Sequence, residues 1–139
     1  MSLNRDVIES IKHIVDTNPY WNLLDMRVQE AEKGRSRCIM TIGPRHLIKR
    51  GTVHGGAIAS LADSAVGIAL MSIVEKHHFI ATVELKINYL SPITQGEIVA
   101  DARIIHKGSR IAVGEVDLTN NGKLAAKCIA TYIISKNRS

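Results

Sequence analysis

The fold of this chain is decided by the stretch GTVHGGAIASLADSAVGIAL, residues 51–70. Over residues 51–74 the only formally charged side chain is that of Asp63. An ionised carboxylate in such a segment is costly unless another group pairs with it or the protein uses it. Gly55 and Gly56 precede the apolar run, at the point where a helix would begin. We therefore interpret the stretch as a buried helix that carries a catalytic acid and starts with an oxygen-binding turn.

The predicted helix, residues 55–75, has two different faces when its residues are placed at intervals of about 100°. One face is apolar and contains Ile58, Leu61, Ala62, Ala65, Ile68, Ala69 and Ile73. The opposite face, called the small-residue stripe below, contains Gly56, Ser60, Asp63, Ser64 and Gly67. A solvent-exposed face normally carries Lys, Glu or Arg, and the stripe carries none of them. It therefore indicates a packed interface or the wall of a ligand site, with a plain exposed surface as the alternative.

The start of this helix is suited to binding an oxygen that gains negative charge. The first N–H groups of a helix have no partner within it, and the helix dipole adds positive charge there. Such groups can hold the carbonyl oxygen of a substrate during acyl transfer. The alternatives are that Gly55 and Gly56 only form a turn, that His54 only pins the loop, and that Asp63 is a surface acid or a salt-bridge partner.

The spacing of Gly55 and Asp63 adds a constraint. The two residues are eight positions apart, which is roughly 12 Å along a helix. One carbonyl group cannot bind the Gly55 amide and also lie within about 3 Å of Asp63 in the same helix. If both act on one substrate, Asp63 comes from a second copy of the chain. The two helices would then run antiparallel, and each dimer would hold two equivalent sites.

Local patterns predict the remaining elements. An amphipathic helix over residues 4–16, capped by Asn4 and ended by Asn18-Pro19, is predicted from the spacing of Val7, Ile8, Ile11, Ile14 and Val15. Extended segments are predicted over residues 23–32, 35–42, 80–90, 97–106, 111–118 and 123–134. Asn121-Gly122 predicts a tight hairpin, and Lys107-Gly108-Ser109 another reversal. A long helix that is apolar on most sides is best buried by a curved antiparallel sheet, so we predict an α+β fold with a single domain over residues 1–139.

Composition and charge narrow the classes of function. The 139 residues are 45% hydrophobic and 22% charged, which is typical of a soluble globular protein. The net charge of +5 favours an anionic partner, such as nucleic acid, an acidic surface or a phosphate-bearing small molecule, although a generically basic surface is an equal alternative. One Trp, three Tyr and one Phe offer little for base stacking, and no recognition motif is present, so nucleic-acid binding ranks low.

The sequence also predicts where the protein resides. Cys38 and Cys128 lie in apolar runs without metal-ligand spacing, which predicts buried free thiols in a reducing cytoplasm. The first residues lack the apolar core of a signal peptide, so we expect no export. Asp63 argues against a membrane span over residues 51–74, since an acid at the bilayer centre costs about 2.5–3.5 kcal/mol.

These residues resemble the hallmark of a known family. Gly51-Thr52-Val53-His54-Gly55-Gly56 followed by Leu61-Ala62-Asp63 is similar to the central motif of the PaaI-like acyl-CoA thioesterases of the hotdog-fold superfamily. The stretches TVELKINYLSP, residues 82–92, and GKLAA, residues 122–126, are similar as well. The resemblance implies a hotdog fold, in which a curved antiparallel sheet wraps a long helix, assembled as dimers and often as dimers of dimers. It implies hydrolysis of a thioester to a carboxylic acid and coenzyme A in the cytoplasm, with no metal or redox cofactor.

The resemblance also implies roles for the reacting residues. The Gly55 amide would polarise the thioester carbonyl, with His54 beside it, and Asp63 of the neighbouring chain would activate water or attack directly. Thr82 would help to orient the water. Gly56 and Ser64 would contact the substrate.

Two further positions bear on how the substrate is held. The basic turn Lys107-Gly108-Ser109-Arg110 lies where the family commonly contacts the nucleotide phosphates, with a solvated hairpin turn as the alternative. Ile48 replaces an asparagine that many relatives carry, and His46 or Lys49 could compensate for it.

Two other functions fit the same residues. A non-catalytic acyl-CoA binding or sensing protein is favoured by Ile48, and a thioesterase acting on acyl groups held by a carrier protein would use the same motif. Hotdog dehydratases rank lower, because they usually pair a histidine with an acid in a different motif.

Overall fold

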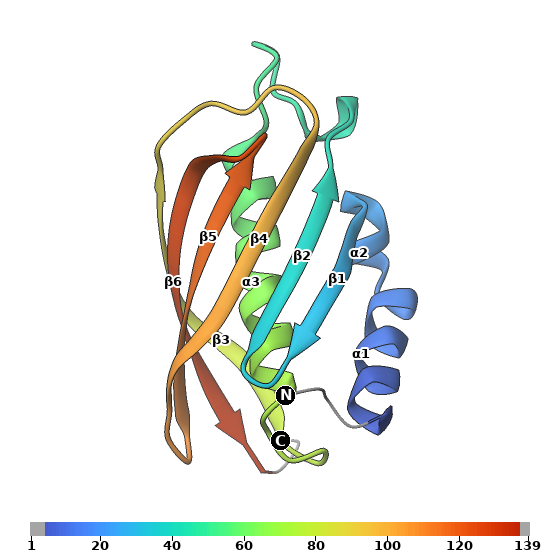
Figure 1. Ribbon diagram of the computed structural model, residues 1–139, viewed down its shortest axis with the longest axis vertical. Helices are drawn as coiled ribbons and strands as arrows, with labels where there is room; N and C mark the ends of the chain where they lie inside the picture. Colours follow the sequence, from blue (N-terminus) through green and yellow to red (C-terminus); the bar gives the residue numbers. More distant parts are fainter. Residues whose placement is uncertain (1–4, 137–139) are drawn as a thin grey trace.

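A six-stranded antiparallel sheet curves around one long helix (Figure 1). The computed structural model describes residues 5–136. The strands are β1 (Met26–Glu32), β2 (Arg35–Thr41), β3 (Phe79–Tyr89), β4 (Glu97–Lys107), β5 (Ile111–Asn120) and β6 (Lys123–Ser135), in the order β1-β2-β4-β5-β6-β3. The helices are α1 (Arg5–Thr17), α2 (Pro19–Leu24) and α3 (Gly55–Met71), with a short 3₁₀ turn at Pro44–His46. The expected α+β fold with a wrapped central helix is confirmed.

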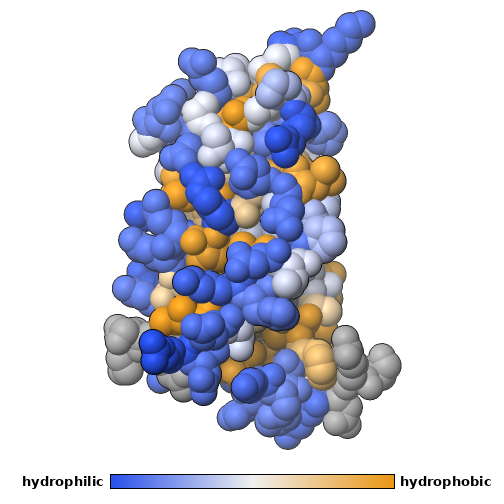
Figure 2. Space-filling view, turned by 90° about the vertical axis from the view of Figure 1, so that its right-hand side faces the viewer, coloured by the Kyte–Doolittle hydropathy of each residue, from blue (hydrophilic) through white to orange (hydrophobic). Residues whose placement is uncertain are grey.

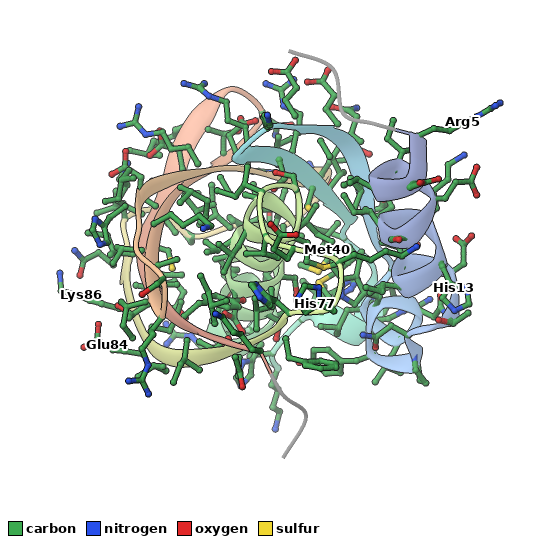
Figure 3. The ribbon with its side chains drawn as sticks, turned by 90° about the horizontal axis from the view of Figure 1, so that it is seen from below. Arg5, His13, Met40, His77, Glu84 and Lys86 are labelled. Atoms are coloured by element: carbon green, nitrogen blue, oxygen red, sulfur yellow. The ribbon has the colours of Figure 1, made fainter. Side chains whose placement is uncertain are left out.

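The core lies between α3 and the concave face of the sheet. Nine residues of α3 are buried: Ala57, Ile58, Leu61, Ala62, Ala65, Val66, Ile68, Ala69 and Leu70. Met40 of β2 points into the same space (Figure 3) and is fully buried. Many of the buried helix residues are alanines, so the backbone of the helix comes close to the sheet. The hydroxyl of Ser36 on β2 accordingly reaches the carbonyl oxygen of Ala65, at 2.6 Å.

Strand β3 lies at an edge of the sheet and pairs only with β6 among the described strands. Strands β4, β5 and β6 form the predicted meander, and the hairpin at Asn121-Gly122 is confirmed by positive φ angles of 52° and 77°. No local pattern indicated that β3 would join the far side of this meander. Glu84 and Lys86 of β3 point outward, away from α3 (Figure 3).

The N-terminal region covers the other edge of the sheet, at the right of Figure 1. That side of the molecule is largely hydrophilic, with apolar patches between the charged side chains (Figure 2). The short helix α2 was not predicted: the Asn18 side chain accepts the Tyr20 N–H and starts a second helix directly after α1. The predicted extended segment from residue 23 therefore begins later, at Met26. The proposed cap Asn4 lies outside the described residues.

The central helix is shorter than predicted, since α3 ends at Met71 instead of residue 75. The Ser72 hydroxyl donates to the carbonyl oxygen of Ala69 at 2.6 Å and accepts the Gly34 N–H at 2.7 Å. This contact with the β1–β2 turn holds the C-terminal end of the helix. Ile73, which the wheel placed on the apolar face, is therefore outside the helix, although it still packs against the core.

Candidate active site

The glycine motif forms the N-terminus of α3 as predicted. His54 is the N-cap residue, and its Nδ1 accepts the Gly56 N–H at 2.8 Å. This contact fits both readings of His54, as a group that hydrogen-bonds near the oxygen-binding turn and as one that only pins the loop. Within residues 5–136 no acceptor is paired with the Gly55 N–H. This N–H group is thus available to a ligand at the positive end of the helix dipole.

The tyrosine at the end of β3 holds this turn from the other side. The Tyr89 hydroxyl donates to the carbonyl oxygen of Gly55 at 2.7 Å. A methyl group at Gly55 would lie 3.0 Å from Tyr89 Cζ, so the glycine leaves room for the ring. An open groove of about 410 Å³ runs past this contact, lined among others by Thr52, Ile58 and Pro92.

Asp63 is held by two hydroxyl groups from different strands. Its Oδ1 accepts a hydrogen bond from Thr82 Oγ1 of β3 at 2.8 Å and one from the Tyr132 hydroxyl of β6 at 2.8 Å. No lysine, arginine or histidine in the part of the chain that the structure describes forms an ion pair with it. The reading of Asp63 as an internal salt-bridge partner is therefore wrong. The carboxylate is half-buried beside an exposed threonine, at the open edge of the sheet.

A β-bulge brings Thr82 to Asp63. Thr82 pairs with Tyr132, whereas Leu85 pairs with Ala130, because the register shifts between Thr82 and Glu84. Cross-strand partners share a face, so Thr82 and Leu85 both face the helix although they are three positions apart. Strict alternation would have turned Thr82 away from Asp63.

Tyr132 is a functional candidate that the sequence analysis missed. Its side chain is only 5% exposed, and this burial raises the pKa of its hydroxyl; the hydrogen bond with Thr82 opposes the shift, and the charge of Asp63 adds to it. The phenol therefore stays protonated at neutral pH and acts as a donor. The alternation of buried residues along β6, Cys128, Ala130, Tyr132 and Ile134, was the available signal.

The small-residue stripe of α3 is covered in part by the chain itself. The Tyr20 hydroxyl of α2 lies 2.6 Å from Ser60 Oγ, and the Tyr132 hydroxyl lies against Gly67. Ser60, Asp63, Ser64 and Gly67 are half-buried, while Gly56 is exposed. The stripe is therefore not a plain exposed surface at Ser60 and Gly67, and its role as a packed interface or a ligand wall stays a prediction.

Two groups of predicted substrate contacts lie apart. The turn Lys107-Gly108-Ser109-Arg110 joins β4 to β5 at the bottom of Figure 1, whereas α3, whose first residue is Gly55, begins at the top. The Ile104 N–H donates to the carbonyl oxygen of Gly34, and the Gly34 N–H donates to Ser72 at the C-terminal end of α3, so β4 runs past that end of the helix just before the turn. Within one chain the turn therefore does not reach the Gly55 amide.

Ile48 lies in the loop before the glycine motif with an exposed side chain. His46 cannot compensate for the missing asparagine, because both of its ring nitrogens are engaged. Nδ1 accepts the Gly43 N–H at 2.9 Å, which makes Nε2 the donor to the carbonyl of Leu24 at 2.8 Å. Lys49 remains exposed in the same loop.

The described residues contain no group of three His, Cys, Asp or Glu side chains placed to hold a metal ion. Over residues 5–136, no helix combines the length and the hydrophobicity that crossing a membrane requires.

Comparison with known proteins identifies the family. A family model described as the thioesterase superfamily matches residues 50–126, which is more than half of the chain. Acyl-coenzyme A thioesterase 13 of Homo sapiens is 32% identical over 130 residues, covering 91% of this chain and 92% of the relative. The same-named protein of Mus musculus is 42% identical over 93 residues, covering 65% and 66%.

Solved structures agree with these sequence matches. A thioesterase from Pseudomonas aeruginosa is 25% identical with a TM-score of 0.84, covering 91% of this chain and 92% of that one. The phenylacetic acid degradation protein PaaI from Thermus thermophilus is 26% identical with a TM-score of 0.77, covering 84% and 98%. With its hotdog fold and PaaI-like motif, this chain belongs to the thioesterase superfamily and is a thioester hydrolase.

Proposed function

We propose that the protein hydrolyses acyl-CoA thioesters and that each active site is shared between two protomers. The observation that carries this proposal is the arrangement on α3: the Gly55 N–H is available at its start, and Asp63 is held at the open edge two turns later. The separation of roughly 12 Å prevents one chain from completing the site. The names of the relatives, which specify acyl-coenzyme A, support the substrate class.

The edge strand β3 supports the shared site. Its outer edge is unpaired among the described strands, and Val83 at its bulge is 59% exposed. The Thr82 end of β3 contacts Asp63 and the Tyr89 end contacts Gly55. Antiparallel pairing of two β3 strands would therefore bring the Thr82 end of one chain towards the Tyr89 end of the other. Asp63 of the partner subunit would then approach the Gly55 amide.

The proposed reaction uses few groups. The Gly55 N–H binds the thioester carbonyl oxygen, and the partner subunit's Asp63 takes a proton from a water molecule that attacks the carbonyl carbon. Negative charge develops on the oxygen at the helix N-terminus. The carbon–sulfur bond then breaks, and the departing sulfur takes the proton back from the partner subunit's Asp63, so that coenzyme A leaves as the thiol. Direct attack by the carboxylate of Asp63 is the alternative first step.

The same antiparallel dimer would also bring the basic turn of residues 107–110 close to the proposed site. Because the turn lies at the far end of the sheet from the start of α3, an antiparallel dimer would carry the partner subunit's Lys107 and the partner subunit's Arg110 to the end where Gly55 begins the helix. Coenzyme A carries several negative charges, which suits the net charge of +5.

Thiol release from a panel of acyl-CoAs tests the activity. The Asp63→Asn variant should lower turnover at least about 10³-fold, since the amide cannot accept a proton from water. Asp117→Asn, which changes a carboxylate on the outer face of the sheet, is the matched control and should retain full activity. Binding of acyl-CoA without turnover would instead select the non-catalytic binding protein. Turnover of carrier-protein thioesters alone would select the carrier-directed enzyme.

Mixed dimers test the shared site. Gly55→Pro removes the N–H at a helix position that tolerates proline, and Asp63→Asn removes the base. If sites are shared, a dimer with one chain of each kind has one intact site and one doubly altered site. It should regain about half of the wild-type activity, as the two-fold symmetry of such a dimer requires. Verified mixed dimers without recovery would exclude the shared site.

A further inference from the structure

The hydrogen bonds at Asp63 are unequal between its two oxygens. Both donors, the hydroxyls of Thr82 and Tyr132, are directed to Oδ1. No hydrogen bond from another described residue reaches Oδ2. One oxygen of the carboxylate is therefore held, and the other is left to a substrate or a water molecule.

We propose that Tyr132 is a positioning residue for Asp63, holding Oδ1 together with Thr82 so that Oδ2 faces the reacting water. This inference rests on the proposed function of Asp63 as a base. Tyr132 suits the role better than Thr82, because its ring is almost fully buried in β6 while Thr82 is exposed at the edge. A buried ring has few alternative orientations, so its hydroxyl is a fixed reference point.

The hydroxyl of Tyr132 also joins the carboxylate to the helix backbone. It lies 2.6 Å from the carbonyl oxygen of Asp63 and 2.8 Å from its Oδ1. Its single proton is within reach of both acceptors. Rotation of the Asp63 side chain away from this position would cost the Oδ1 contact.

Gly67 provides the space that this contact needs. Gly67 follows Asp63 by one helical turn, and a methyl group there would lie 3.1 Å from the Tyr132 hydroxyl oxygen. The ring carbons Cε2 and Cζ would be 3.8 Å away, at ordinary contact distance. The hydroxyl, and not the ring, is therefore the part of Tyr132 that requires glycine in the small-residue stripe.

The first test removes only the hydroxyl. Tyr132→Phe should lower kcat about 10- to 100-fold, because a base that is misplaced by about 1 Å loses catalytic power of this size. KM for the best acyl-CoA should change less than about twofold, since the substrate contacts remain. Tyr20→Phe is the matched control, because it removes a hydroxyl that binds α3 at Ser60 and should leave kcat unchanged. Wild-type kcat in Tyr132→Phe would overturn the inference.

The second test uses Gly67→Ala in both backgrounds. With Tyr132 present, the added methyl displaces the hydroxyl and should lower kcat several-fold. In the Tyr132→Phe background no hydroxyl remains to be displaced, so Gly67→Ala should have no further effect. The melting temperature should not fall with activity, since alanine favours a helix interior over glycine. Equal losses of kcat in the two backgrounds would contradict the proposed contact.

These outcomes are separable from those that test the function itself. If Asp63→Asn is inactive and Tyr132→Phe is fully active, the function stands and the positioning role is wrong. If the wild type releases no thiol from any acyl-CoA, both are wrong.

Discussion

The hydroxyl of Tyr89 donates a 2.7 Å hydrogen bond to the carbonyl oxygen of Gly55, 34 residues earlier in the chain. This contact ties the first residue of α3 to the last residue of the edge strand β3. It is the counterpart of the contact between Asp63 and Thr82, near the other end of the same strand. The two candidate halves of the site are thus both fastened to β3.

Two substitutions at Gly55 should separate the role of its N–H from that of its small size. Gly55→Ala and Gly55→Pro both add a Cβ that would lie 3.0 Å from Tyr89 Cζ, but only proline removes the N–H. We expect alanine to lower kcat modestly and proline to lower it a further 10²- to 10³-fold, as removal of one oxyanion donor does. Steady-state kinetics on one acyl-CoA measures both. Equal kcat values for the two variants would show that the Gly55 N–H does not stabilise the negative charge that develops on the carbonyl oxygen in the transition state.

The basic turn should contribute to binding of the nucleotide part of coenzyme A. Replacing Lys107 and Arg110 together with alanine should raise KM for acyl-CoA about 3- to 30-fold, and the increase should shrink at high salt because exposed charges are screened. The corresponding pantetheine thioester, which lacks the nucleotide, should show an unchanged KM. A parallel rise in KM for both substrates would argue for a structural effect of the turn.

Gly114 should be intolerant of a side chain for a reason of packing. A Cβ at this position of β5 would lie 2.6 Å from Val66 Cγ1 of α3. We expect Gly114→Ala to lower the free energy of unfolding by about 1–3 kcal/mol, the usual cost of overpacking. Denaturant titration measures it, and Gly43→Ala, at a position with no atom within 4 Å, is the control.

A second change should relieve the same clash. Val66→Ala removes the methyl groups that the new side chain would strike, so the double variant should be less destabilised than the sum of the two single variants. If the stability losses of the two single variants simply add in the double variant, the strain that Gly114→Ala causes lies elsewhere in the core and not at Val66.

The two buried thiols should make stability fall in alkaline solution. Burial raises the pKa of Cys38 and of Cys128 from 9.0 to about 12. The unfolded chain therefore loses these protons at lower pH than the folded one, so their contribution is complete below about pH 9 and is lost as the pH rises towards 12. The expected slope is about 1 kcal/mol per thiol and pH unit.

Denaturant titrations at pH 8 and pH 10 measure this effect. A variant with Cys38→Ala and Cys128→Ala should lose less stability over the interval than the wild type, because the other titrating groups are common to both proteins. The same loss in both would show that the thiols do not account for the decline.

Local sequence determined much of this protein. The apolar run of residues 57–70 specified a buried helix, the glycines at 55 and 56 specified its start, and Asn121-Gly122 specified a hairpin. These features depend on periodicity and on φ angles, which act over a few neighbouring residues. Asp63 could likewise be identified from the sequence, because it is the only charged residue in the stretch 51–74.

Tertiary structure alone decided which groups surround Asp63. Tyr132 is 69 residues away, and only the pairing of β3 with β6 brings it and Thr82 to the same carboxylate oxygen. The bulge at Thr82 cannot be predicted from the polar and apolar pattern of residues 79–89, since it is a shift in how β3 pairs with β6. The role of His46 is likewise set by tertiary contacts: its two ring nitrogens bind Gly43 and Leu24, so it cannot replace the asparagine absent at position 48. Contacts between segments far apart in the sequence depend on how the whole core packs, and no local pattern encodes them.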